Sequence, residues 1–251
     1  MKKIYVTGFP HSGTSILRVK LGEGKNVFEQ EQESPYPLHL EEFEKSNKEF
    51  YLWKRPIHLN LVDNPFDSIV KYGFKYKSES YFKDDYIVFI MRSPYFSYSS
   101  IYEIFKNEFG ESKAAESLVD NFTRHFIPTA KLFLDAKYNS YDKVYTIYYE
   151  EMFENNNKLL KELMNSIGIE QEVSINETKK HFIGKIPYEE NQIPNTKPDQ
   201  YLEDPGYYRT WQINQPFSNF NNINKINLPQ ELIDVLDNSE IVKELGYRNP
   251  L

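Results

Sequence analysis

Residues 8–15 have the composition of a loop that binds a phosphate group. They follow residues 4–7, a short apolar and β-branched run that predicts a buried strand. A helical pattern begins at Ser12. In a strand–loop–helix unit, successive backbone N–H groups point into the loop, and the helix N-terminus adds partial positive charge. The stretch therefore predicts a site for an anion.

One position of this loop restricts which phosphate compound it can hold. Gly8, Gly13 and Ser15 fit the P-loop signature Gly-x-x-x-x-Gly-Lys-Ser/Thr, but Thr14 stands at the lysine position. Without that lysine, no loop cation reaches the β- and γ-phosphates, so hydrolysis of ATP or GTP is disfavoured. The hydroxyl groups of Thr14 and Ser15 suit a single phosphate better than a triphosphate with its magnesium.

Arg92 and Ser100 form a second set of anion-binding groups. They follow residues 86–91, whose continuous apolar character predicts a central strand buried on both faces. Pro94 then starts a helix that carries Ser100. The planar fork of Arg92 and the hydroxyl of Ser100 fit one phosphate dianion. A surface ion pair of Arg92 at the strand end is the alternative.

Strand patterns alternate with helical patterns along the chain. Strands are expected at residues 4–7, 51–53, 86–91 and 143–148, and helices from 12 to about 22 and at 63–72, 95–109, 112–137 (bent at Pro128), 155–166 and 228–245. This alternation predicts an α/β fold: a three-layer sandwich with a central, mainly parallel, P-loop-like sheet and helices on both faces. Ligands bind such sheets at the C-terminal strand ends, where residues 8–15, 54–58 and 92–100 all fall.

Length and charge restrict the class of protein. The 251 residues suffice for one domain, so we expect a single domain over residues 1–251, with 169–227 as irregular loops over the site. With 30 Lys and Arg against 37 Asp and Glu, the net charge of -7 argues against general nucleic-acid binding. An anionic cofactor must then be held by a few local cations.

Cysteine is absent from the sequence, which excludes disulfides and thiolate metal sites. No His, Asp and Glu residues have the spacing of metal ligands, and we expect no metal. The apolar run near the N-terminus is too short for a signal sequence or a membrane span. We therefore expect a cytoplasmic protein that associates with neither membranes nor nucleic acids.

Taken in order, these motifs resemble those of sulfotransferases, which use PAPS (3′-phosphoadenosine 5′-phosphosulfate) as sulfuryl donor. The sequence GFPHSGTS at residues 8–15 resembles the family's 5′-phosphosulfate loop. The family usually has Lys or Arg before Ser-Gly-Thr, whereas this chain has His11. The resemblance implies that the 5′ end of the cofactor contacts five residues: His11, Ser12, Gly13, Thr14 and Ser15.

The other end of the cofactor is implied by three later segments. The family's 3′-phosphate motif is a strand followed by Arg-x-Pro and a helix that bears a serine. This chain resembles it, with Arg92 as the arginine and Ser100 as the serine. Residues 148–152 are similar to the family's Tyr-Glu-Asp/Glu-Leu/Met element, so Tyr149 is a candidate to face the adenine. Arg209 is a candidate for the late basic segment of the family. A packing role for Tyr149 and a surface role for Arg209 stay open.

Two residues are candidates to stabilise the reacting groups. In sulfuryl transfer an acceptor attacks sulfur in line and adenosine 3′,5′-diphosphate leaves, so donors are needed where negative charge grows. Lys54 stands in Lys-Arg-Pro, which fits the family's Lys-x-Pro, and it is the candidate for the leaving oxygen and the sulfuryl group. His11 could donate to the same oxygens.

The general base is predicted to be His58, which lies just past Lys54. An imidazole with a pKa near ~6.5 can accept the acceptor proton at neutral pH. A lone histidine is more often structural, and Glu31, Glu33 or Asp63 could serve instead.

The predicted function is transfer of a sulfuryl group from PAPS to a hydroxyl or amine of a carbohydrate or another small molecule, in a pocket shaped by residues 30–39 and 169–207. One alternative is a P-loop-type small-molecule kinase. It would need a lysine at position 14, where this chain has threonine, and an acidic magnesium ligand after a strand. Asp84 and Asp85 instead come before the strand predicted at residues 86–91. Another alternative is a non-catalytic nucleotide-binding protein, which would tolerate Lys54→Ala.

Overall fold

A parallel sheet forms the centre of this protein, which a computed structural model describes except for residues 58–63, 172–210, 212–213 and 216. Its described strands are β1 (Lys2–Gly8), β2 (Val27–Glu29), β3 (Phe50–Lys54), β4 (Tyr86–Met91) and β5 (Val144–Tyr148). They lie in the order β2-β3-β1-β4-β5, and every neighbouring pair is parallel. The predicted parallel α/β sheet is confirmed.

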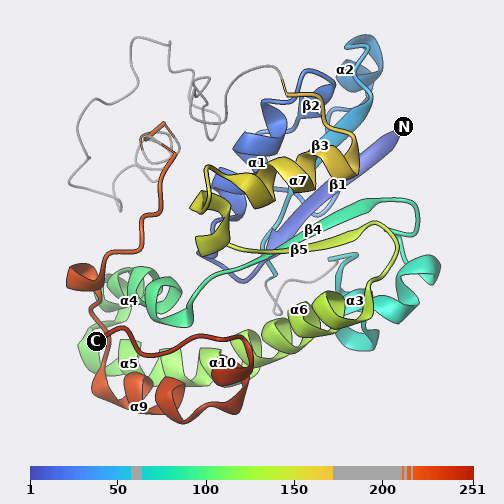
Figure 1. Ribbon diagram of the computed structural model, residues 1–251. Helices are drawn as coiled ribbons and strands as arrows, with labels where there is room; N and C mark the ends of the chain where they lie inside the picture. The colour runs from blue at the N-terminus through green and yellow to red at the C-terminus, as the bar shows by residue number, and fades with distance from the viewer. Residues whose placement is uncertain (58–63, 172–210, 212–213, 216) are drawn as a thin grey trace.

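Helices cover both faces of this sheet (Figure 1). The described α-helices are α1 (Thr14–Gly22), α2 (Leu40–Lys45), α3 (Asp67–Tyr72), α4 (Pro94–Phe109), α5 (Glu111–Asn121), α6 (Ile127–Asn139), α7 (Lys158–Ile167), α9 (Gln230–Asn238) and α10 (Glu240–Glu244). Short 3-10 helices occupy Phe74–Glu79, Glu150–Phe153 and Ile223–Lys225. Figure 1 shows α1 and α7 on one face of the sheet and α3 and α6 on the other, with α4, α5, α9 and α10 gathered at one end. This arrangement confirms the predicted three layers.

Strand β4 shows why a continuous apolar run forms the centre of the sheet. Val88 and Ile90 pack into the core beneath α1 and α7, whereas Ile87, Phe89 and Met91 pack into the core on the opposite face. All five side chains are fully buried. Because successive side chains of a strand point to opposite faces, a strand covered on both sides must be apolar at every position.

The long helix predicted at residues 112–137 is present with one irregularity. A π-helical turn, Phe122–Phe126, joins α5 to α6 immediately before Pro128. Proline has no N–H to donate to the carbonyl group four residues earlier, so the regular ladder of hydrogen bonds cannot continue through it. The irregularity therefore lies where the sequence predicts a bend.

Among the differences from the sequence-based expectation, two concern the last predicted helix and an edge strand. The helix predicted over residues 228–245 is divided into α9 and α10 at Ser239, whose backbone is extended with φ -78° and ψ 119°. The break lets Leu236 and Val242 pack into the same core. The edge strand β2 was not predicted, because its three residues are too few to show a periodic pattern.

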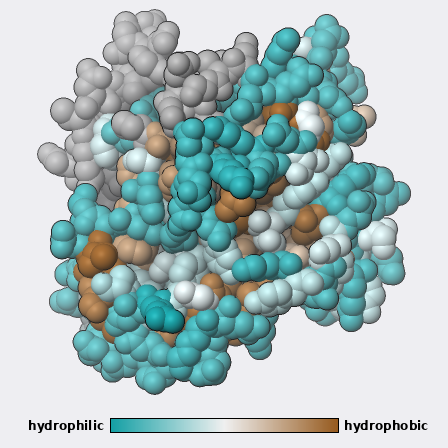
Figure 2. Space-filling model, viewed as in Figure 1, coloured by the Kyte–Doolittle hydropathy of each residue, from teal (hydrophilic) through white to brown (hydrophobic). Residues whose placement is uncertain are grey.

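The face shown in Figure 2 is mainly hydrophilic, with apolar side chains in separate small areas. Within the described ranges, each helix is too short or too polar to cross a membrane.

Candidate cofactor site

The loop of residues 8–15 is held against strand β4. Gly8 lies opposite Ile90 in the parallel ladder, and a Cβ atom on Gly8 would come 2.2 Å from the Ile90 carbonyl oxygen. The Oγ of Ser12 donates to the same oxygen at 3.4 Å, and the Ser12 N–H donates to the Phe9 carbonyl at 3.1 Å. Ser12 is fully buried. The close approach requires glycine and fixes the position of the loop on the sheet.

The second half of the loop turns through left-handed backbone into α1. His11 has φ 62° and Gly13 has φ 94°. A Cβ atom on Gly13 would lie 2.4 Å from Cδ2 of Tyr149, so this position needs glycine for its backbone and for its lack of a side chain. The first turn of α1 contains no acidic residue and no side-chain cap. Its N–H groups are thus of the kind that bind anions at helix N-termini.

Arg92 lies directly against this loop. Its Nη1 donates to the His11 carbonyl oxygen at 3.2 Å, and its Nε donates to Oδ1 of Asn221 at 2.8 Å. The guanidinium carbon lies 4.5 Å from the ring centre of Tyr149 and 5.8 Å from that of Phe96. Two hydrogen bonds and two aromatic rings therefore orient the fork. The structure brings Arg92 to the residues predicted to bind the 5′ end.

Ser100 lies further along α4, on its exposed side. Its Oγ donates to the Phe96 carbonyl oxygen at 3.2 Å. Arg92 contacts the ring of the same phenylalanine, so Phe96 lies between the two predicted 3′-phosphate residues. In the described part of the chain, no direct hydrogen bond joins Arg92 to Ser100.

Tyr149 is buried between the loop and Arg92. Its ring contacts Gly13 and the guanidinium group, and its hydroxyl accepts a hydrogen bond from the Phe220 N–H at 3.2 Å. Burial raises the pKa of Tyr149, although the charge of Arg92 opposes this. Burial also lowers the pKa of Arg92. Tyr149 thus joins the two predicted anion sites by packing, and its proposed contact with adenine stays a prediction.

Lys54 ends strand β3 beside the same loop. It lies opposite Val6 of β1, and the Ile57 N–H donates to the Gly8 carbonyl oxygen at 2.8 Å. The side chain is buried, and its Nζ forms an ion pair with Glu33. A buried ammonium group is costly without a partner, and this carboxylate supplies one for Lys54.

Arg18 positions the segment that leads to Glu33. It is fully buried on α1, its Nη1 donates to the carbonyl oxygens of Gln30 (3.0 Å) and Glu31, and its Nε lies 2.9 Å from Oε1 of Glu29. The guanidinium group therefore ties the end of β2 to α1. Sequence analysis missed Arg18, and a charged residue among the apolar positions of a helix was the available signal.

Comparison with protein-family models found no match, and neither did comparison with curated proteins. Among solved structures, the sulfotransferase domain from the Synechococcus PCC 7002 olefin synthase aligns with 100% of this chain and 96% of its own, with 14% identity and a TM-score of 0.50. This chain has the sulfotransferase fold.

Two further sulfotransferase structures align with a TM-score of 0.45 each. The sulfotransferase domain from the curacin biosynthetic pathway is 14% identical and covers 98% of both chains. Mouse sulfotransferase SULT7A1, complexed with PAP, is 20% identical over 69% of this chain, and the alignment spans 61% of the mouse chain.

Three predicted site residues lie outside the described residues. They are the predicted base His58, its alternative Asp63 and the late basic residue Arg209. The same holds for most of the loop predicted at residues 169–227. In the remainder of the chain, no group of three or more His, Asp and Glu residues could hold a metal ion.

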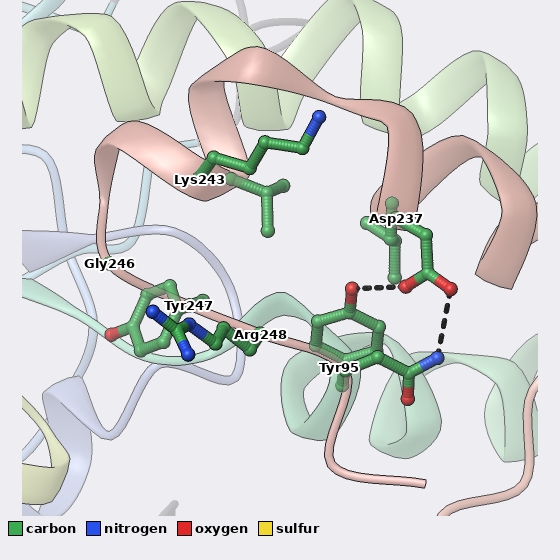
Figure 3. A pocket seen from close by; sticks show the side chains of 9 residues that line it. Tyr95, Asp237, Lys243, Gly246, Tyr247 and Arg248 are labelled. Carbon is green, nitrogen blue, oxygen red and sulfur yellow. Dashed lines mark hydrogen bonds between the residues drawn. The ribbon is translucent and has the colours of Figure 1, made fainter.

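A separate cavity lies at the C-terminal helices and is called the C-terminal cavity below (Figure 3). It has a volume of about 530 Å³, and its lining includes Tyr95, Asp237, Lys243, Tyr247 and Arg248. The Tyr95 hydroxyl donates to Oδ1 of Asp237 at 2.6 Å. Burial, and then this hydrogen bond, raise the pKa of Tyr95. The residues predicted to bind the cofactor are not among those that line this cavity.

Proposed function

We propose that this protein is a PAPS-dependent sulfotransferase that transfers a sulfuryl group to a hydroxyl or amine of a carbohydrate or another small molecule. The observation that supports this most is the contact between the two predicted halves of the cofactor site, where Arg92 donates to the His11 carbonyl oxygen at 3.2 Å. A nucleotide with phosphate on both its 5′ and 3′ positions needs two anion sites within its own length. The two proposed sites follow β1 and β4, which are neighbours in the sheet.

The two phosphates of the cofactor are held in different ways. Backbone N–H groups of the loop, with Thr14 and Ser15 at the start of α1, bind the 5′ end. Arg92, with Ser100, binds the 3′-phosphate through charge-assisted hydrogen bonds. Since the whole chain carries a charge of -7, these local groups rather than the overall field attract the cofactor.

The proposed sulfuryl transfer is an in-line displacement at sulfur. The acceptor oxygen or nitrogen forms a bond to sulfur, the bond from sulfur to the 5′-phosphate oxygen breaks, and the acceptor proton passes to a base. Lys54 stabilises the charge that grows on the leaving oxygen and the sulfuryl oxygens. A buried cation is effective there because the surroundings screen it less than water does.

Glu33, already an alternative to His58 as the base, lies beside the proposed reacting groups, because its carboxylate forms an ion pair with Lys54. The variants Glu33→Gln and His58→Gln distinguish them when kcat is measured against pH. Only the variant of the base removes that group's ionisation from the profile, whereas Glu33→Gln can also lower kcat by removing the partner of Lys54. The variant of the true base should lower kcat and leave the affinity for adenosine 3′,5′-diphosphate unchanged. If both variants retain full kcat, neither residue is the base.

Calorimetry with adenosine 3′,5′-diphosphate and AMP tests the proposed function. We expect tighter binding of the diphosphate, independent of Mg²⁺, followed by turnover when acceptors are screened with labelled PAPS. Equal affinity for the two nucleotides would contradict the proposed 3′-phosphate site. Tight, magnesium-dependent binding of ATP would favour phosphoryl transfer instead.

A further inference from the structure

The carboxylate of Glu150 connects three segments of the chain behind Arg92. Its Oε1 accepts hydrogen bonds from the Ser93 N–H at 3.1 Å and from Nδ2 of Asn221 at 2.8 Å. Its Oε2 accepts from the Tyr247 hydroxyl at 3.1 Å. The partners come from the start of α4, the segment before the last helices, and the C-terminal segment. An ionised carboxylate only accepts hydrogen bonds, so it holds all three donors at once.

This carboxylate determines which way the Asn221 amide points. Because Glu150 accepts from Nδ2, the Oδ1 of Asn221 must face away from it, and this oxygen accepts from Nε of Arg92 at 2.8 Å. A reversed amide would place its oxygen against the carboxylate and its NH₂ against a guanidinium N–H. Glu150 therefore imposes one amide orientation, and that orientation suits Arg92.

Asn221 also keeps the negative charge away from the arginine fork. A carboxylate bonded directly to Arg92 would occupy the donors that a phosphate needs and would neutralise their charge. Here the neutral amide of Asn221 lies between Glu150 and Arg92. Glu150 therefore orients Arg92 indirectly, and the guanidinium group keeps its charge for binding a phosphate. The His11 carbonyl oxygen, which accepts from Nη1, supplies the second fixed point of the fork.

We propose that Glu150 is a positioning residue for the 3′-phosphate, acting through Asn221 to hold Arg92 in its binding orientation. This inference rests on the proposed function. It assigns to Glu150 and Asn221 the preference for adenosine 3′,5′-diphosphate over AMP, which lacks the 3′-phosphate. Arg92 makes the contact, and the other two residues decide how well it is made.

Tyr247 supports Glu150 from the opposite side. Its ring lines the C-terminal cavity in Figure 3, and its hydroxyl reaches back to the carboxylate. Burial raises the pKa of Tyr247 well above its ordinary value, and the charge of Glu150 raises it further, so the hydroxyl stays a donor at neutral pH. Tyr247→Phe should weaken the nucleotide preference less than loss of Asn221, because the link from Glu150 to Arg92 remains.

A double-mutant cycle tests the proposal, with calorimetric Kd values for adenosine 3′,5′-diphosphate and AMP. We expect Glu150→Ala and Asn221→Leu each to reduce the preference for the diphosphate about tenfold, with AMP binding unchanged. The double variant should lose no more than either single variant, since both residues act in one chain of contacts. Asn224→Leu, an exposed asparagine of the same segment, is the matched control and should keep the full preference.

Three results would overturn the proposal. The preference could survive in folded Glu150→Ala, it could survive in Asn221→Leu, or the two losses could add in the double variant. Asn221→Leu leaves the bonds of Glu150 to Ser93 and Tyr247 in place, so it decides the matter if Glu150→Ala does not fold. If the wild-type protein itself shows no preference for the diphosphate, the result contradicts the proposed 3′-phosphate site. The role of Glu150 and Asn221 in positioning Arg92 is then not the cause.

Discussion

The loop of residues 8–15 and the Arg92 side chain offer an anion different kinds of positive charge. The loop relies on backbone N–H groups, and its shape depends on Gly8 and Gly13, where side chains would meet Ile90 and Tyr149. Arg92 brings one full charge, but its direction depends on groups from distant parts of the chain. A backbone site is thus determined by local geometry, whereas a side-chain site needs partners that hold it.

This difference predicts which ligands each kind of mutation affects. Damage to the loop should weaken every nucleotide with a 5′-phosphate, including both adenosine 3′,5′-diphosphate and AMP. Damage to Arg92 should weaken only nucleotides with a 3′-phosphate. Binding of the two nucleotides therefore distinguishes damage at the loop from damage at Arg92, and turnover adds a test of Lys54.

Gly13→Ala should have the largest effect. The new Cβ would sit in left-handed backbone 2.4 Å from Tyr149, so we expect the free energy of unfolding to fall by roughly 3 kcal/mol and both nucleotides to lose affinity. Denaturant unfolding and calorimetry measure these changes. Gly168→Ala is the control, because its backbone is left-handed like that of Gly13 (φ 93°, ψ 24°) and the nearest atom to its added Cβ, Cζ of Phe50, lies 3.7 Å away. Equal destabilisation by the two variants would show that the contact with Tyr149 does not matter.

Lys54→Ala should lower kcat about 100-fold, since one donor to the developing charge is removed. The affinity for adenosine 3′,5′-diphosphate should change little. Lys77→Ala controls for the loss of a buried lysine, because Lys77 is also buried and donates to the Lys83 carbonyl oxygen. An unchanged turnover number in Lys54→Ala would exclude Lys54 from the mechanism.

Arg92→Ala should weaken binding of adenosine 3′,5′-diphosphate by roughly 1–3 kcal/mol, because a charge-assisted contact is lost. Binding of AMP should stay the same, which calorimetry can establish in parallel. Arg92→Lys keeps the charge but loses the planar fork, and should recover only part of the affinity. A matching loss for AMP would mean that Arg92 supports the loop instead of the 3′-phosphate.

Ser100→Ala should have the smallest effect, a loss of about 0.5–1.5 kcal/mol in diphosphate binding, as expected for one neutral hydrogen bond. Its hydroxyl donates to the Phe96 carbonyl oxygen and must turn to reach a phosphate. Ser112→Ala, on the exposed surface of α5, is the control. If the two variants bind the diphosphate equally well, Ser100 has no part in the site.

Local patterns predicted much of the fold. The apolar run of β4 and the glycine spacing of residues 8–15 each carry their signal within a few neighbouring residues. The three residues of β2 carry no period, and the break at Ser239 depends on how α9 and α10 pack into one core. A very short edge strand and a break between two helices are both determined by tertiary contacts, so the sequence patterns did not predict them.

By itself, the sequence determined the glycine-containing loop of residues 8–15, the central strand and the place of Arg92 at a strand end. These features follow from residue types that stand next to one another, through backbone geometry and periodicity. Only the tertiary structure decided that Lys54 pairs with Glu33 and that Asn221 lies between Glu150 and Arg92. Asn221 is 71 residues from Glu150 and 129 from Arg92, and no local rule relates side chains so far apart until the sheet and its helices bring them together.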